Sequence, residues 1–157
     1  MDTGFITTEV VDQFERVFEL LRKGVGQFTP GKWREGESSY MRPAGLVYHL
    51  LETVDFYTSG KGTDDYPWGH RFNLEWEEKD SDKFPNQEEM LVYLEEMQAR
   101  VREWLEHADP TSKEALHPWT GKTLLGKALY ILRHTQHHTA ELGVVLFEKE
   151  ARDMGWR

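Results

Sequence analysis

The stretch that decides the fold is TLLGKALYILRHTQHHTAELGVVLFEKEA, residues 123–151. Apolar residues recur along it with the 3.6-residue period of one face of a helix, as shown by Leu124, Ala128, Ile131, Leu142 and Val145. The pattern therefore predicts one long amphipathic helix, and that helix carries His134, His137 and His138.

Two helices are predicted in the first part of the chain. The first covers about residues 5–24, where apolar residues recur every three or four positions. Gly24 and Gly26 come after the last residues of the apolar pattern and are expected to end this helix. The second runs from Pro43 to about residue 59, because proline suits the first helical position, where its missing N–H would have no partner.

A third helix is predicted over about residues 87–107. Asn86 can cap its first turn, and Glu89 stands three residues later as the reciprocal partner. Strand patterns are scarce, so the chain is expected to be all-α: a four-helix bundle with a long crossover between the second and third helices, over residues 61–86.

Composition limits the possible functions. The chain has 157 residues, which suits a single domain over 1–157, and a net charge of −9, which makes nucleic acid an unfavourable partner. It contains no cysteine, so a thiol nucleophile and a Cys-ligated zinc are excluded. The first residues lack the features of a signal peptide, and no apolar run could span a membrane, so we expect a cytoplasmic protein.

The histidines are the candidate metal ligands. His134 and His138 are four residues apart and share a helix face, which apolar neighbours indicate is turned inward. His49 lies on the inward face of the second helix. Buried imidazoles need partners, and three of them with an open fourth position are typical of a catalytic metal site. The alternative is that they are core histidines bonded to polar neighbours.

Two familiar metal motifs do not fit. A zincin requires Glu directly after the first histidine of H-E-x-x-H, and Thr135 stands there. A di-iron carboxylate bundle requires two E-x-x-H motifs, and only Glu114 and His117 form one, followed at once by Pro118.

At these residues the chain resembles the DinB-like superfamily of metal-binding four-helix bundles. The matching residues are His49 in VYHLLE, and His134 and His138 in HTQHHTAEL. Many members have Gly at the position of Thr139 or Ala140, so the subfamily is not fixed. The resemblance implies a divalent metal, often zinc, nickel or iron(II), and often a homodimer. Characterised relatives include transferases and isomerases that use thiols such as mycothiol or bacillithiol.

The first functional hypothesis is therefore a transferase that joins a low-molecular-weight thiol to a small electrophilic substrate. A metal-dependent hydrolase and a bundle that binds a metal or ligand without catalysis are the alternatives. Glu141 shares the face of His134 and His138, so we expect it to act as a base, orient a ligand or bind the metal weakly. The alternative is a glutamate on the helix surface, and we favour the role near the site.

The crossover is rich in aromatic residues and offers a wall for the substrate. Its candidate substrate-binding residues are Tyr66, Trp68, His70 and Trp76. The alternative is that these side chains simply cover the hydrophobic end of the bundle.

Overall fold

The computed structural model describes residues 3–155 and is all-helical, with no strand in that part of the chain, so the predicted all-α class is confirmed. Four of its helices are long. The helices are α1 (Thr3–Gln27), α2 (Pro30–Arg34), α3 (Pro43–Thr58), α4 (Gln87–His107) and α5 (Leu124–Glu150). Two short 3-10 turns, η1 (Ser39–Met41) and η2 (Ser81–Lys83), precede α3 and α4.

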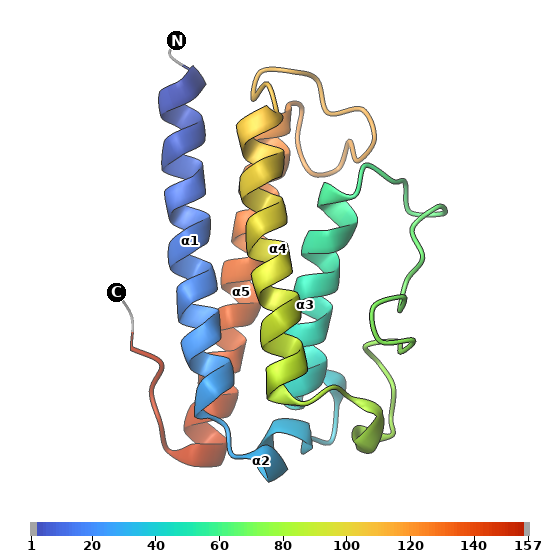
Figure 1. Cartoon of the computed structure of the whole chain (residues 1–157), viewed down its shortest axis with the longest axis vertical. Helices are drawn as coiled ribbons and strands as arrows, with labels where there is room; N and C mark the ends of the chain where they lie inside the picture. Colours follow the sequence, from blue (N-terminus) through green and yellow to red (C-terminus); the bar gives the residue numbers. More distant parts are fainter. Residues whose placement is uncertain (1–2, 156–157) are drawn as a thin grey trace.

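The four long helices lie side by side around a shared core (Figure 1). α1 packs against α4 and α5, and α3 packs against the same two helices. The colours in Figure 1 show that α3 and α4 run in the same direction, opposite to α1 and α5. Because α3 and α4 are parallel, residues 59–86 must run back along the molecule, a distance of about 30 Å for a helix the length of α4.

This connection packs against the helices along its course. Tyr66, Leu74 and Phe84 are buried in the core, and Trp76 is partly buried against it. The backbone N–H of Gly69 donates to Glu52 on α3 over 2.6 Å, which fixes the middle of the connection to that helix. The predicted crossover is therefore a covering layer for the outer side of α3.

Two of the predicted helix starts are confirmed in detail. Pro43 is the first residue of α3, as its missing N–H predicts. Asn86 and Glu89 form a full capping box at α4: the Asn86 side chain accepts from the Glu89 N–H, and the Glu89 carboxylate accepts from the Asn86 N–H. Thr123 caps α5 by accepting from the N–H of Gly126.

α1 is longer than predicted, because Gly24 and Gly26 do not end it. Gly24 instead provides room for the C-terminal segment: a Cβ there would lie 2.3 Å from the Sδ atom of Met154. Val25 is fully buried, so burial keeps this turn helical despite the glycines on either side. The short helix α2 was also not predicted, since five residues are too few to show a period.

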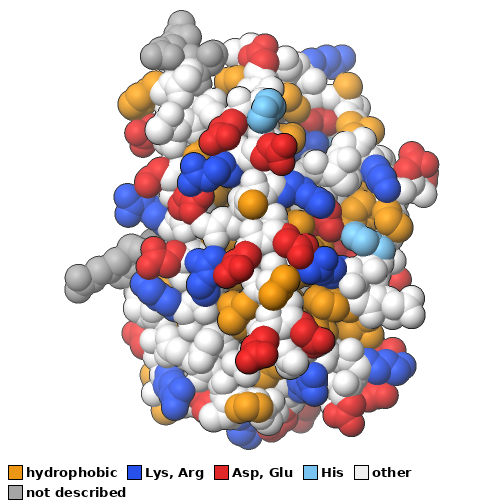
Figure 2. Space-filling view, in the orientation of Figure 1, with side chains coloured by type: hydrophobic (Ala, Val, Ile, Leu, Met, Phe, Trp, Pro, Cys, Tyr) orange, Lys and Arg blue, Asp and Glu red, His pale blue; other side chains and the backbone are white. Residues whose placement is uncertain are grey.

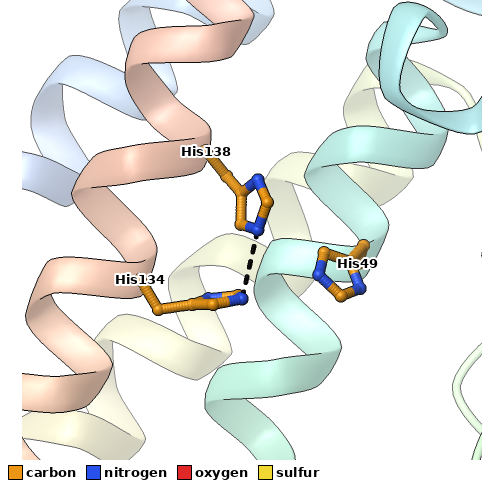
Figure 3. Close-up of side chains that lie close together, drawn as sticks. All are labelled: His49, His134 and His138. Carbon is orange, nitrogen blue, oxygen red and sulfur yellow. Dashed lines mark hydrogen bonds between the residues drawn. The ribbon is translucent and has the colours of Figure 1, made fainter.

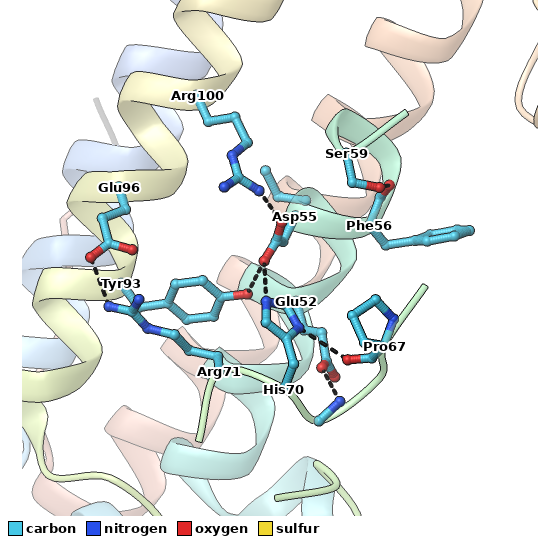
Figure 4. A network of polar contacts seen from close by, with 12 residues as sticks. Glu52, Asp55, Phe56, Ser59, Pro67, His70, Arg71, Tyr93, Glu96 and Arg100 are labelled. Atoms are coloured by element: carbon cyan, nitrogen blue, oxygen red, sulfur yellow. Dashed lines mark hydrogen bonds and ion pairs between the residues drawn. The ribbon is translucent and has the colours of Figure 1, made fainter. Parts of the chain in front are cut away.

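α3 is the central helix, with 14 of its 16 residues buried. α4, α5 and the crossover cover it on different sides, so its polar side chains meet partners in more than one direction. His49 points toward α5, and Asp55 points toward α4 (Figures 3 and 4). The polar side chains of α3 therefore face two separate regions, one toward α5 and one toward α4.

On the face shown in Figure 2, acidic and basic side chains are intermixed and no large field of one sign forms. Within residues 3–155, no helix combines the length and apolar character needed to cross a membrane.

Candidate metal centre

Three histidines from two helices converge between α3 and α5 (Figure 3). His49 comes from α3, and His134 and His138 come from successive turns of α5. Each offers one ring nitrogen, and the three nitrogens all lie within 4.8 Å of one another. The structure therefore brings together the three residues predicted as metal ligands, in a group that can hold a metal ion.

The spacing of two of the nitrogens suits a shared ion. The Nε2 atoms of His134 and His138 are 3.1 Å apart. Two nitrogens bound tetrahedrally to zinc at about 2.0–2.1 Å would be separated by about 3.4 Å. Only a small movement of one ring would therefore place both atoms at bonding distance from one ion.

Two of the rings are held neutral. Burial, with a smaller contribution from neighbouring His138, lowers the pKa of His49 to about 4 and that of His134 to about 3. A neutral imidazole has a free lone pair, which is the form that binds a metal. At neutral pH, His49 and His134 are therefore already in the neutral form that can bind an ion.

The protein gives these rings few polar partners of its own. Within the described residues, the His49 ring makes no hydrogen bond, and the Nδ1 atom of His134 is buried without one. The nearby hydroxyls of Thr135 and Thr139 donate to carbonyls of their own helix. The alternative of core histidines bonded to polar neighbours therefore does not fit His49, while the ring of His138 is the hydrogen-bond partner of His134.

His138 is oriented by Glu141. Its Nδ1 atom lies 2.6 Å from a Glu141 carboxylate oxygen, so this nitrogen carries the proton and donates. The Nε2 atom then keeps its lone pair and faces His134. A carboxylate that holds a histidine in this way is a common support of metal ligands. Glu141 therefore acts behind His138, as a residue that positions it.

Two aromatic rings flank the three histidines. Trp76 lies 4.3 Å from His49, centroid to centroid. Tyr40 stacks on His138 at 6.0 Å and meets Trp76 edge-on at 5.1 Å. Trp76 was among the predicted substrate-binding residues, whereas Tyr40 was missed. It lies in the turn η1, where no periodic pattern marks a functional side chain.

The other predicted substrate-binding residues lie elsewhere. Tyr66 and Trp68 pack against Phe56 of α3, and His70 packs against Tyr66. The structure shows no contact between these three residues and the histidine group. The expectation of one aromatic wall over the metal therefore holds only for Trp76, because the connection leads Tyr66, Trp68 and His70 along another side of α3.

A second grouping shares His138. His137, His138 and Glu141 also place one ligand atom each within 4.8 Å of one another. All three come from α5, and the His137 side chain is 65% exposed. Here His138 would use Nδ1, which already donates to Glu141. The group with His49 is the stronger candidate, because it joins two helices and leaves that hydrogen bond intact.

Compared with known proteins, the chain matches no family model, no curated protein and no solved structure. The function must therefore be inferred from the site itself.

Proposed function

We propose that the protein binds one divalent transition metal through His49, His134 and His138. The observation that carries this proposal is the convergence of three ring nitrogens from two helices within 4.8 Å. Three neutral ligands leave the ion its full charge and an open position for a small molecule. Zinc, nickel and iron(II) all accept such a ligand set, so we do not assign one of them.

When bound, such an ion lowers the pKa of a coordinated thiol or water and thereby supplies a nucleophile near neutral pH. The residues of the chain hold and shape this site. Glu141 fixes the tautomer and the direction of His138. Tyr40 and Trp76 offer flat apolar surfaces beside the ligands, on which the organic part of a small substrate can lie.

We propose further that the reaction is a thiol-dependent transfer in a four-helix bundle of the DinB-like type. The matching histidine positions support the family, and the absence of cysteine is consistent with a thiol that arrives as a cosubstrate. In this reaction the sulfur forms a bond to an electrophilic carbon, the leaving group departs with its electron pair, and the thiol proton passes to solvent. Metal-dependent hydrolysis is the second candidate reaction.

The test uses metal-loaded, tag-free protein with a thiol and 1-chloro-2,4-dinitrobenzene as the electrophile. Cysteine, mycothiol and bacillithiol would each be supplied, and the coloured thioether would be followed. We expect turnover with at least one thiol, and its loss in His49→Ala. His137→Ala is the matched control on α5 and should keep its activity, because its ring lies outside the proposed group.

The outcomes separate the candidates. No turnover with any thiol, but hydrolysis of an activated ester such as 4-nitrophenyl acetate that depends on His49, would favour the hydrolase. Tight metal binding with neither activity would favour a bundle that binds a metal without catalysis.

A further inference from the structure

A second site opens on the α4 side of α3. It is a cleft of about 740 Å³, bounded by the C-terminal parts of α3 and α4 and by residues 61–70 of the crossover. None of the three clustered histidines lines it. Its volume is within the range of sites that take small organic molecules, which is about 300–1,000 Å³.

The cleft floor is a buried carboxylate with partners from two elements, α4 and the crossover. Asp55 of α3 is only 3% exposed. It accepts a hydrogen bond from the Tyr93 hydroxyl over 3.0 Å and pairs with Arg100, both on α4 (Figure 4). His70 of the crossover approaches it to 3.4 Å through Nε2. A buried charge of this kind is stable only with such partners.

His70 faces acceptors at both ring nitrogens. Its Nδ1 atom lies 3.0 Å from the carbonyl oxygen of Pro67, while Nε2 faces Asp55. Only the protonated ring has a proton on each nitrogen to offer to both acceptors. Arg100 and the His70 ring thus lie around one carboxylate on the cleft floor.

Most N–H donors of the Arg100 guanidinium have no hydrogen-bond partner among the described residues. Asp55 takes one Nη1 bond, and within the described residues the guanidinium has no other hydrogen-bond partner. An arginine offers five N–H donors. Its side chain is 44% exposed, so the remaining donors are accessible from the cleft. Lys61 stands at the rim, and its ammonium forms no ion pair in residues 3–155.

The walls are aromatic and apolar. Tyr66, Pro67 and Trp104 line the cleft. Tyr66 is buried, and its hydroxyl has no hydrogen-bond partner. Glu103 is the acidic side chain at the rim, and it opposes the charge of Lys61.

We propose that this cleft is a binding site for a small aromatic carboxylate. The carboxylate of the ligand would accept hydrogen bonds from Arg100 and form an ion pair with Lys61. The aromatic ring of the ligand would lie against Tyr66 and Trp104. The inference is independent of the metal centre, because it uses none of that centre's residues.

The test is a titration with 1-naphthoate, followed by two-dimensional ¹H–¹⁵N NMR of the full chain. We expect saturable shifts at backbone amides of residues 59–70 and 100–108, and weaker binding by at least tenfold for the neutral analogue 1-naphthalenemethanol. Shifts confined to the histidine centre, or equal binding of the neutral compound, would overturn the proposal.

Variants make the test specific. Lys61→Gln and Arg100→Lys should each weaken naphthoate binding several-fold, the latter because lysine lacks the forked donors of arginine. Glu103→Gln should strengthen it. Arg102→Gln is the matched control on α4, since Arg102 pairs with Glu15 outside the cleft. Loss of binding in Arg102→Gln equal to that in Arg100→Lys would contradict the assignment.

Discussion

At the scale of single residues, the hydrogen bond between His138 and Glu141 determines which nitrogen faces the metal centre. Replacing Glu141 by Gln leaves a similar shape but gives a neutral and weaker acceptor. We expect the affinity for zinc to fall roughly 10- to 100-fold, the range found for such supporting partners. Competition with a chromophoric chelator would measure it. Glu148→Gln, an exposed change on the same helix, should leave the affinity unchanged.

The partly buried His49 and His134 also predict how stability depends on pH. The pKa is about 4 for His49 and about 3 for His134 in the folded protein, against about 6.5 for an unfolded histidine. At a pH between these values the unfolded chain binds more protons than the folded protein. The contribution of the two neutral histidines to the free energy of unfolding is therefore complete above pH 6.5 and is lost as the pH falls toward 4. The urea midpoint of metal-free protein should therefore decrease from pH 7.5 to pH 5.

The double variant His49→Gln, His134→Gln provides the comparison for this pH effect. Its urea midpoint should decrease less over the same interval, because neither substituted side chain titrates there. An equal decrease in both proteins would assign the pH dependence to other groups.

The sequence could predict some site residues and not others. The four-residue spacing of His134 and His138, and the position of His49 among apolar residues, identified the three clustered histidines. Tyr40 could not be predicted, because a three-residue turn shows no period. The cleft was missed as well, although Asp55 within an apolar helix was a signal: a buried carboxylate requires a cation, which Arg100 provides.

At the scale of helices and loops, the start of α5 depends on two glycines in close contact. A Cβ on Gly121 would lie 2.8 Å from the Cα atom of Gly126, and backbone cannot move aside cheaply. We expect Gly121→Ala to lower the free energy of unfolding by about 1–3 kcal/mol, as overpacking does. Urea denaturation would measure the change.

Gly26→Ala is the control for this loss. Nothing lies within 4 Å of a Cβ at Gly26, which is inside the last turn of α1. Alanine should therefore stabilise the protein by about 0.5–1 kcal/mol through helix propensity alone. If both substitutions destabilised the protein equally, close packing would not explain the effect at Gly121.

Helix positions could be predicted better than helix ends and loop paths. Local signals such as Pro43 and the Asn86–Glu89 capping box determine where α3 and α4 begin. The end of α1 depends on burial of Val25 and on contact between Gly24 and Met154, which are distant in the sequence. The path of the crossover was not predictable for the same reason, and three of its four candidate residues therefore lie away from the histidines.

At the scale of the whole molecule, α5 leaves large apolar side chains in solvent. Leu129, Val144 and Phe147 are 50%, 60% and 65% exposed. We predict that this helix face supports a homodimer, since a second copy would remove it from water. Sedimentation at 50–100 μM should give the mass of a dimer, and Phe147→Asp should give that of a monomer. A monomeric wild type at these concentrations would contradict the prediction.

The central claim is that His49, His134 and His138 hold one metal ion. Elemental analysis of tag-free protein tests it most directly, with His49→Ala, His134→Ala and the control His137→Ala prepared alongside. We expect about one equivalent of zinc, nickel or iron in the wild type and in His137→Ala, and none in the other two variants, with helical content unchanged in all four. Equal metal content in wild type and His49→Ala, or no uptake by the wild type when each ion is supplied, would contradict it.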